Sequence, residues 1–145
     1  MPQMLTYSVL VLFVTLLLGS LPTLAQRETR HEKFHRQHVA AKSNTLDPRL
    51  YCNRMMQRRC MTTVKCKPVN TFIHGEDTAV DAICNTGGTH SSENYYDSNS
   101  LFELTRCQST GRGTEPPCSY QGSLTTQRVR VACVNGLPVH FQQAL

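Results

Sequence analysis

The sequence predicts an α+β fold that is held together by disulfides. Three observations support this prediction: segments of helical composition come first, alternating strand-like segments come later, and all seven cysteines follow an export signal. The 145 residues carry a formal net charge of +5. Because the chain is short, cross-links would help its small core to remain folded.

Residues 1–25 have the layout of a secretory signal peptide. This stretch has no charged side chain, its apolar run extends from Val9 to Leu18, and small residues precede a cleavage site after Ala25. The apolar run is shorter than the roughly 20 residues that a membrane-spanning helix needs. We therefore expect a single secreted, extracellular domain, residues 26–145, whose cysteines pair rather than bind metal.

Helices are expected in the first half of the mature chain and strands mainly in the second. The expected helices are 28–38, 50–60 and 76–84. The expected strands are 69–74, 101–107, 119–124, 128–134 and 139–144. Asn135-Gly136 between the last two is a strong hairpin signal. The segment 85–100 is rich in turn-forming residues, and we expect it to form a long exposed loop.

Histidines are the main candidates for chemistry. The chain contains His31, His35, His38, His74, His90 and His140. A pair of histidines can supply one neutral base and one protonated acid near neutral pH, although any single histidine is more often structural or exposed. His38 closes the first expected helix and His140 lies in the last strand. His31 and His35, spaced i, i+4, could instead ligate a metal, but the sequence indicates no third ligand.

The basic composition suits a polyanionic partner. RNA, a glycosaminoglycan, an anionic membrane and an acidic protein all fit this charge, and the alternative is a soluble basic domain with no such partner. The chain contains no nucleophile elbow, no phosphate-cradling Gly-rich loop and no HExxH motif. Charge alone therefore leaves several classes of partner open.

One seven-residue string is specific to a known family. Cys66-Lys67-Pro68-Val69-Asn70-Thr71-Phe72 matches the CKxxNTF signature of the pancreatic ribonuclease superfamily. The segments FHRQH (34–38), YCNRMM (51–56) and LPVHF (137–141) resemble further parts of that family, in its order. The resemblance covers essentially all of 26–145 and implies three short helices packed on a bent antiparallel sheet.

The resemblance also implies an activity. It implies an endoribonuclease that cleaves single-stranded RNA on the 3′ side of pyrimidines, through a 2′,3′-cyclic phosphate, without metal or cofactor. His38 resembles the general base, His140 the general acid, and Lys67 the cation beside the transition state. The residues expected to contact substrate are Lys33, Arg36, Gln37, Lys67, Pro68, Val69, Asn70, Thr71 and Phe141.

The cysteine pattern resembles the angiogenin-like branch, which has three disulfides. The implied pairs are Cys52–Cys107, Cys66–Cys118 and Cys84–Cys133. The family's fourth disulfide is absent, since 85–106 contains no cysteine. Cys60 is left over, as a free thiol, a mixed disulfide or a dimer contact. We expect a monomer in which Cys60 is free and partly exposed.

Several residues depart from the usual family pattern. Gln143 stands where the angiogenin-like branch carries a glutamine in the pyrimidine pocket, so we expect attenuated activity. The alternative is that Gln143 is only a surface residue on a chain terminus. Gln142 replaces an aspartate that normally orients the catalytic acid. Val134 replaces a glutamate that normally helps to hold the second nucleotide base of the substrate.

Two other functions remain open from the sequence. The chain could be an angiogenin-like signalling ligand, or a cationic host-defence protein, with weak nuclease activity secondary in both cases. The possible partners besides RNA are cell-surface polyanions, anionic membranes and ribonuclease inhibitor. Tyr95, Tyr96 and Asp97 occupy the segment where the angiogenin-like branch carries basic cell-binding residues. This difference argues against the hypothesis of a signalling ligand.

Overall fold

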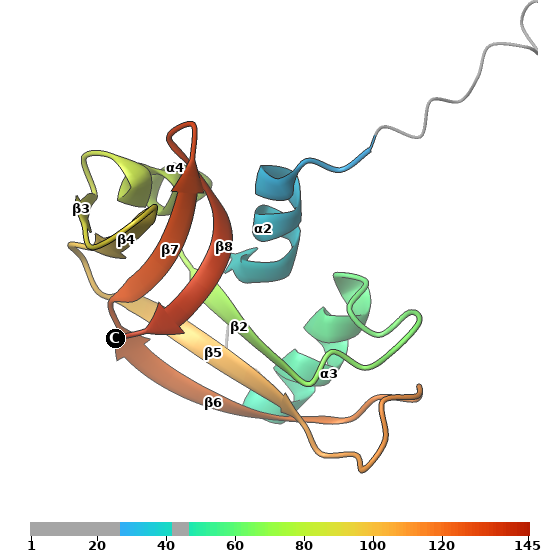
Figure 1. Ribbon diagram of the computed structural model, residues 1–145. Helices are drawn as coiled ribbons and strands as arrows, with labels where there is room; N and C mark the ends of the chain where they lie inside the picture. The colour runs from blue at the N-terminus through green and yellow to red at the C-terminus, as the bar shows by residue number, and fades with distance from the viewer. Residues whose placement is uncertain (1–26, 42–46) are drawn as a thin grey trace, which may run out of the picture.

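A computed structural model describes residues 27–41 and 47–145; the expected signal peptide lies outside the described residues. Within those ranges the helices are α2 (Arg30–His38), α3 (Pro48–Arg58) and α4 (Asp77–Asp81), and α4 continues into a 3-10 turn, η1 (Ala82–Cys84). None of the helices in these ranges has the length and apolar character to cross a bilayer. The predicted α+β class with three short helices is confirmed (Figure 1).

The strands form two four-stranded sheets. The first sheet has the order β1 (Val39–Ala40), β2 (Val69–His74), β5 (Phe102–Ser109) and β6 (Tyr120–Gln127). The second has the order β3 (Gly88–His90), β4 (Tyr95–Ser98), β7 (Val129–Val134) and β8 (Leu137–Ala144). All pairings are antiparallel except β1 with β2. Helix α2 lies beside β8, and α3 lies beside β6 (Figure 1).

The buried side chains form two clusters, one between the two sheets beneath α2 and one between α3 and the first sheet. Beneath α2, Phe34 and Ile73 pack with residues of β5 and β7. Beneath α3, Met56 and Phe72 pack around the ring of Tyr120. All five side chains are at most 1% exposed, so each contributes roughly 1.5–3 kcal/mol by leaving water.

Three disulfides cross-link the domain: two join a helical segment to a strand, and one joins the segments that precede β2 and β6. They are Cys52–Cys107, Cys66–Cys118 and Cys84–Cys133, the pairs that the family resemblance implies. Cys60 is free and exposed just beyond α3. Its φ of 63° is in the left-handed region, which is common for the residue that follows a helix but unusual for a cysteine.

The hairpin signal in the last third of the chain is confirmed. Asn135 and Gly136 connect β7 to β8 with φ angles of 52° and 76°. Both residues tolerate this left-handed backbone, which matches the twist of the flanking strands. The tight turn places β8, and His140 within it, directly beside β7.

The expectation of a long exposed loop at 85–100 is wrong. This segment forms β3 and β4, and β4 pairs with β7. Its side chains are largely polar and exposed, so the segment lacks the apolar alternation by which a strand is recognised. The strands are held by backbone pairing and by an ion pair between Asp97 and Arg130, which face each other in register at 2.7 Å.

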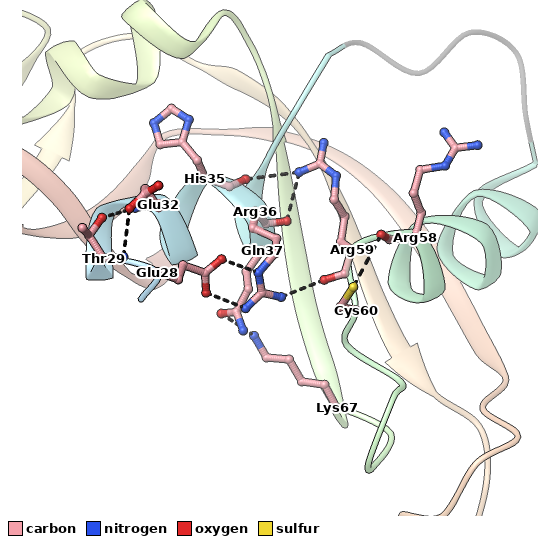
Figure 2. A network of polar contacts seen from close by, with 10 residues as sticks. All are labelled: Glu28, Thr29, Glu32, His35, Arg36, Gln37, Arg58, Arg59, Cys60 and Lys67. Carbon is pink, nitrogen blue, oxygen red and sulfur yellow. Dashed lines mark hydrogen bonds and ion pairs between the residues drawn. The ribbon is translucent and has the colours of Figure 1, made fainter. Parts of the chain in front are cut away.

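Helix α2 is capped by specific hydrogen bonds at both ends. Thr29 and Glu32 form a capping box at the first turn, with each side chain bonded to the other residue's backbone N–H. At the other end, one nitrogen of the Arg59 guanidinium, Nη1, donates to the carbonyl oxygens of His35 and Arg36 (Figure 2) and to that of Val39. A cation at this position also opposes the negative end of the helix dipole.

Replacement of Arg59 by Ala is expected to loosen the docking of α2. The variant loses charge-assisted hydrogen bonds to three helix-end carbonyls, so the free energy of unfolding should fall by about 2 kcal/mol. Urea unfolding followed by circular dichroism measures this change. Arg58→Ala is the matched control, because Arg58 is exposed and its side chain makes none of these contacts. Equal effects of the two substitutions would contradict the assignment.

Candidate active site

His38 is held in a nearly closed environment at the end of α2. Its ring is 8% exposed and lies between two phenylalanines, Phe34 at 5.4 Å and Phe141 at 5.3 Å between ring centroids. Its Nδ1 donates to the carbonyl oxygen of Thr71 at 2.8 Å. Since a carbonyl can only accept, this bond places the proton on Nδ1 and leaves Nε2 with a free lone pair.

Burial lowers the pKa of His38 to about 3. The hydrogen bond to Thr71 opposes this shift, while the positive charges of Lys67 and His140 add to it. The ring is therefore neutral at pH 7. A neutral imidazole with an open Nε2 is the state that a general base requires.

Lys67 is a half-buried cation whose hydrogen-bond partners are neutral. Its Nζ donates to Asn70 Oδ1 at 2.9 Å and to Gln37 Oε1 at 3.4 Å. Burial lowers the pKa of Lys67, and the nearby charges of Lys33 and Arg36 lower it further. An anion bound beside its ammonium would therefore offset the cost of burying this charge and its repulsion by Lys33 and Arg36.

A chain of hydrogen bonds positions the Lys67 segment. Asn70 is 2% exposed, and its Nδ2 donates to the Gln37 carbonyl at 2.8 Å. From β6, the Tyr120 hydroxyl donates to the Lys67 carbonyl at 2.8 Å, and the Tyr120 backbone N–H bonds Asn53 of α3. Both the backbone and the side chain of Lys67 are therefore fixed by buried groups.

His140 lies exposed on β8, opposite Ala132 of β7. His38 and His140 together line a cleft of about 250 Å³. The other lining residues are Arg30, Lys33, Phe34, Gln37 and Val139. One histidine is thus buried and neutral, and the other is exposed to solvent.

A second hollow of about 460 Å³ continues from this cleft through Lys33 and Gln37. Four basic residues line it: Lys33, Arg36, Lys65 and Lys67. Arg36 is partly neutralised by Glu28, whose carboxylate accepts from Nε at 2.7 Å (Figure 2). The two hollows together form a basic surface that suits a polyanion.

The other residues expected to bind substrate differ in exposure. Pro68 and Val69 are exposed, whereas Thr71 is buried at 8% exposure. Phe141 was expected beside a base, and the structure shows it stacked on His38 at an interplanar angle of 28°. Gln143 is exposed on β8, where it pairs in register with Arg130 of β7.

Sequence reasoning missed the residues that position this site. Arg59 and Tyr120 act through backbone carbonyls, so neither residue leaves a motif of its own. Asp81 also had no signal, although its carboxylate lies 2.6 Å from His35. Each of these contacts joins segments at least 20 residues apart, which no local pattern records.

A buried neutral histidine, an exposed histidine and an ammonium with neutral partners define a site for acid–base chemistry on an anionic substrate. The pancreatic ribonuclease family model matches residues 29–142, and the chain belongs to this family.

Individual relatives agree with this assignment. The chain is 49% identical to a ribonuclease of Chelydra serpentina over 119 residues, covering 81% of this chain and all of the relative. It is 46% identical to angiogenin of Mus musculus over 136 residues, covering 92% of each chain. The crystal structure of green turtle egg white ribonuclease superposes with a TM-score of 0.79 at 48% identity, covering 81% of this chain and all of that one.

The burial of His38 should make stability depend on pH. Between about pH 6.5 and 5 the unfolded chain binds a proton at His38 and the folded protein does not, so the free energy of unfolding should fall as the pH falls. The expected loss from His38 is about 2 kcal/mol over this range. Urea unfolding at several pH values measures it.

His38→Asn should flatten this pH dependence, because the variant has no group that titrates at this position. His90→Gln is the control, since His90 is an exposed histidine that should leave the dependence unchanged. A wild-type slope in the His38→Asn variant would show that His38 is not buried in its neutral form.

Proposed function

We propose that this protein is an endoribonuclease that cleaves single-stranded RNA on the 3′ side of pyrimidines. The observation that carries the proposal is the cleft in which neutral His38 and exposed His140 lie near the Lys67 ammonium. Family membership supports it, because the pancreatic ribonuclease family binds RNA. The angiogenin relative adds no observation that favours a signalling role over this activity.

The reaction follows from the two histidines. His38 Nε2 accepts the proton of the ribose 2′-hydroxyl, whose oxygen attacks the adjacent phosphorus. The bond from phosphorus to the 5′-oxygen breaks, and His140 donates a proton to that oxygen. The products are a 2′,3′-cyclic phosphate and a free 5′-hydroxyl, and water later opens the cyclic phosphate. DNA is not cleaved because it lacks the nucleophile.

Lys67 stabilises the charge that grows on the phosphate oxygens. A fixed ammonium in a partly desolvated site interacts more strongly with that charge than a mobile one in water. Gln37, whose amide oxygen is near Lys67, contributes its amide nitrogen to the scissile phosphate. Lys33 and Arg36 bind a neighbouring phosphate of the strand.

The pyrimidine preference is assigned to Thr71. Its carbonyl is occupied by His38, so its backbone N–H and hydroxyl remain to read the base edge. Pro68, Val69 and Asn70 line the approach to this position, and Phe141 closes the far side of His38. We place this activity outside the cell, as a monomer, with ribonuclease inhibitor and cell-surface polyanions as possible further partners.

Removing either histidine should abolish most RNA cleavage. His38→Ala and His140→Ala are expected to lower kcat/KM by about 10²- to 10⁴-fold through loss of the base or the acid. Lys67→Ala should lower it by about 10²- to 10³-fold. Cleavage of a defined RNA oligonucleotide by the purified proteins measures these effects, with His90→Ala as the control.

The pH profile gives an independent check on this assignment. The wild type should show a bell-shaped dependence of kcat/KM, since one group must be neutral and the other protonated. Equal RNA loss in the wild type and in both histidine variants would indicate a contaminating nuclease and would refute the assignment.

Gln143 is proposed to restrict the pyrimidine site and to hold the activity low. Gln143→Ala should then raise the rate of cleavage of a pyrimidine–adenosine dinucleotide several-fold. Gln121→Ala is the control, because Gln121 is another exposed glutamine, on β6. An unchanged rate in Gln143→Ala would leave Gln143 as a surface residue.

A further inference from the structure

Three polar side chains outside the catalytic cleft converge between α2 and α4. His31 and His35 lie one turn apart on α2, with ring centroids 4.5 Å apart. Asp81 of α4 faces both: its Oδ1 lies 2.6 Å from His35 Nε2, and its Oδ2 lies 3.7 Å from His31 Nε2. All three are partly buried, and none of them lines the cleft that holds His38 and His140.

We propose that His31, His35 and Asp81 bind a divalent transition-metal ion of the zinc class. Two imidazole nitrogens and one carboxylate oxygen are a donor set that suits zinc, with water in the fourth position. Asp81 supplies the third ligand that the i, i+4 histidine pair lacked in the sequence. The carboxylate also gives the site a negative charge, which offsets part of the free-energy cost of removing water from the cation.

The outer contacts of the histidines orient them for this role. His31 Nδ1 lies 2.9 Å from the carbonyl oxygen of Pro138, so Nδ1 carries the proton and the lone pair of Nε2 points toward Asp81. His35 Nδ1 lies 3.6 Å from the carboxylate of Asp77. Metal-binding histidines commonly donate their second nitrogen to a carbonyl or carboxylate in this way.

The distances are compatible with a bound ion after a small adjustment. The three donor atoms lie within 4.8 Å of one another. A tetrahedral zinc site with bonds of about 2.0 Å places its donors about 3.3 Å apart. The His35–Asp81 contact must open by less than 1 Å, and the His31 donor must move inward. Side-chain rotations at this half-buried surface can supply both movements.

The bound ion would connect three elements of the fold. Its ligands come from α2 and α4, and the carbonyl that orients His31 belongs to Pro138 of β8. Figure 2 shows the His35 ring pointing away from the Arg36 and Arg59 guanidinium groups, so this contact is separate from the Arg59 cap. The ion would therefore hold α2 from a second side and stabilise the folded protein.

Zinc titration of the metal-free protein tests the proposal. A Cys60→Ser background removes the exposed thiol, which could bind zinc by itself. We expect one ion to bind by calorimetry and to raise the Tm. His35→Gln and Asp81→Asn should remove both effects, while Asp77→Asn should weaken the affinity by about tenfold. His90→Gln, the exposed-histidine control, should bind zinc as the background does.

Two further measurements distinguish this site from the catalytic cleft. His140→Ala should retain the ion, because His140 contributes no ligand. In the NMR spectrum of the background protein, zinc should shift or broaden the ring resonances of His31 and His35, which requires no further variant. Absence of zinc binding, an unchanged Tm shift in Asp81→Asn, or loss of the shift in His140→Ala would overturn the proposal.

Discussion

The hydrogen bond from the buried His38 ring to the carbonyl of Thr71 is the constraint around which the site is arranged. A second hydrogen bond lies beside it, in which the side chain of Asn70 donates to the carbonyl of Gln37. Two consecutive residues of α2 are thereby joined to two consecutive residues of β2. The position of His38 and the placement of the Asn70 amide that holds the Lys67 side chain both depend on this junction.

The same junction lies among positively charged groups that repel one another in the free protein. His38 is neutral because it is buried, and Lys67 is only partly solvated and has neutral partners. Lys33 and Arg36 add more positive charge nearby. In the free protein these groups repel one another, and a bound phosphate would replace that repulsion with attraction. The amide oxygens of Asn70 and Gln37 hold Lys67 in place without neutralising it, whereas Arg36 is partly neutralised by Glu28.

Local signals in the sequence predicted the parts of the fold that depend on local conformation. The bounds of β2 and the turn at Asn135-Gly136 were predicted because apolar composition and glycine tolerance are properties of short segments. Strands β3 and β4 were missed because their polar side chains show no apolar alternation and because β4 pairs with a distant strand, β7. The family-like segments FHRQH, CKPVNTF and LPVHF indicated His38, Lys67 and His140 through resemblance, whereas Arg59, Tyr120 and Asp81 depend on contacts across the fold.

The distribution of cysteines separates helix α2 from the covalent framework. The six paired cysteines lie at or after Cys52, and α2 ends at His38. Apart from the short pairing of β1 with β2, helix α2 is therefore held by side-chain contacts, whereas the segment that holds Lys67 and the strand beside His140 each contain a disulfide-bonded cysteine, Cys66 and Cys133. Local unfolding of α2 in heat or denaturant would displace His38 before the cross-linked body unfolds. Loss of activity and loss of structure would then be two separate transitions, with inactivation the earlier and the more readily reversed.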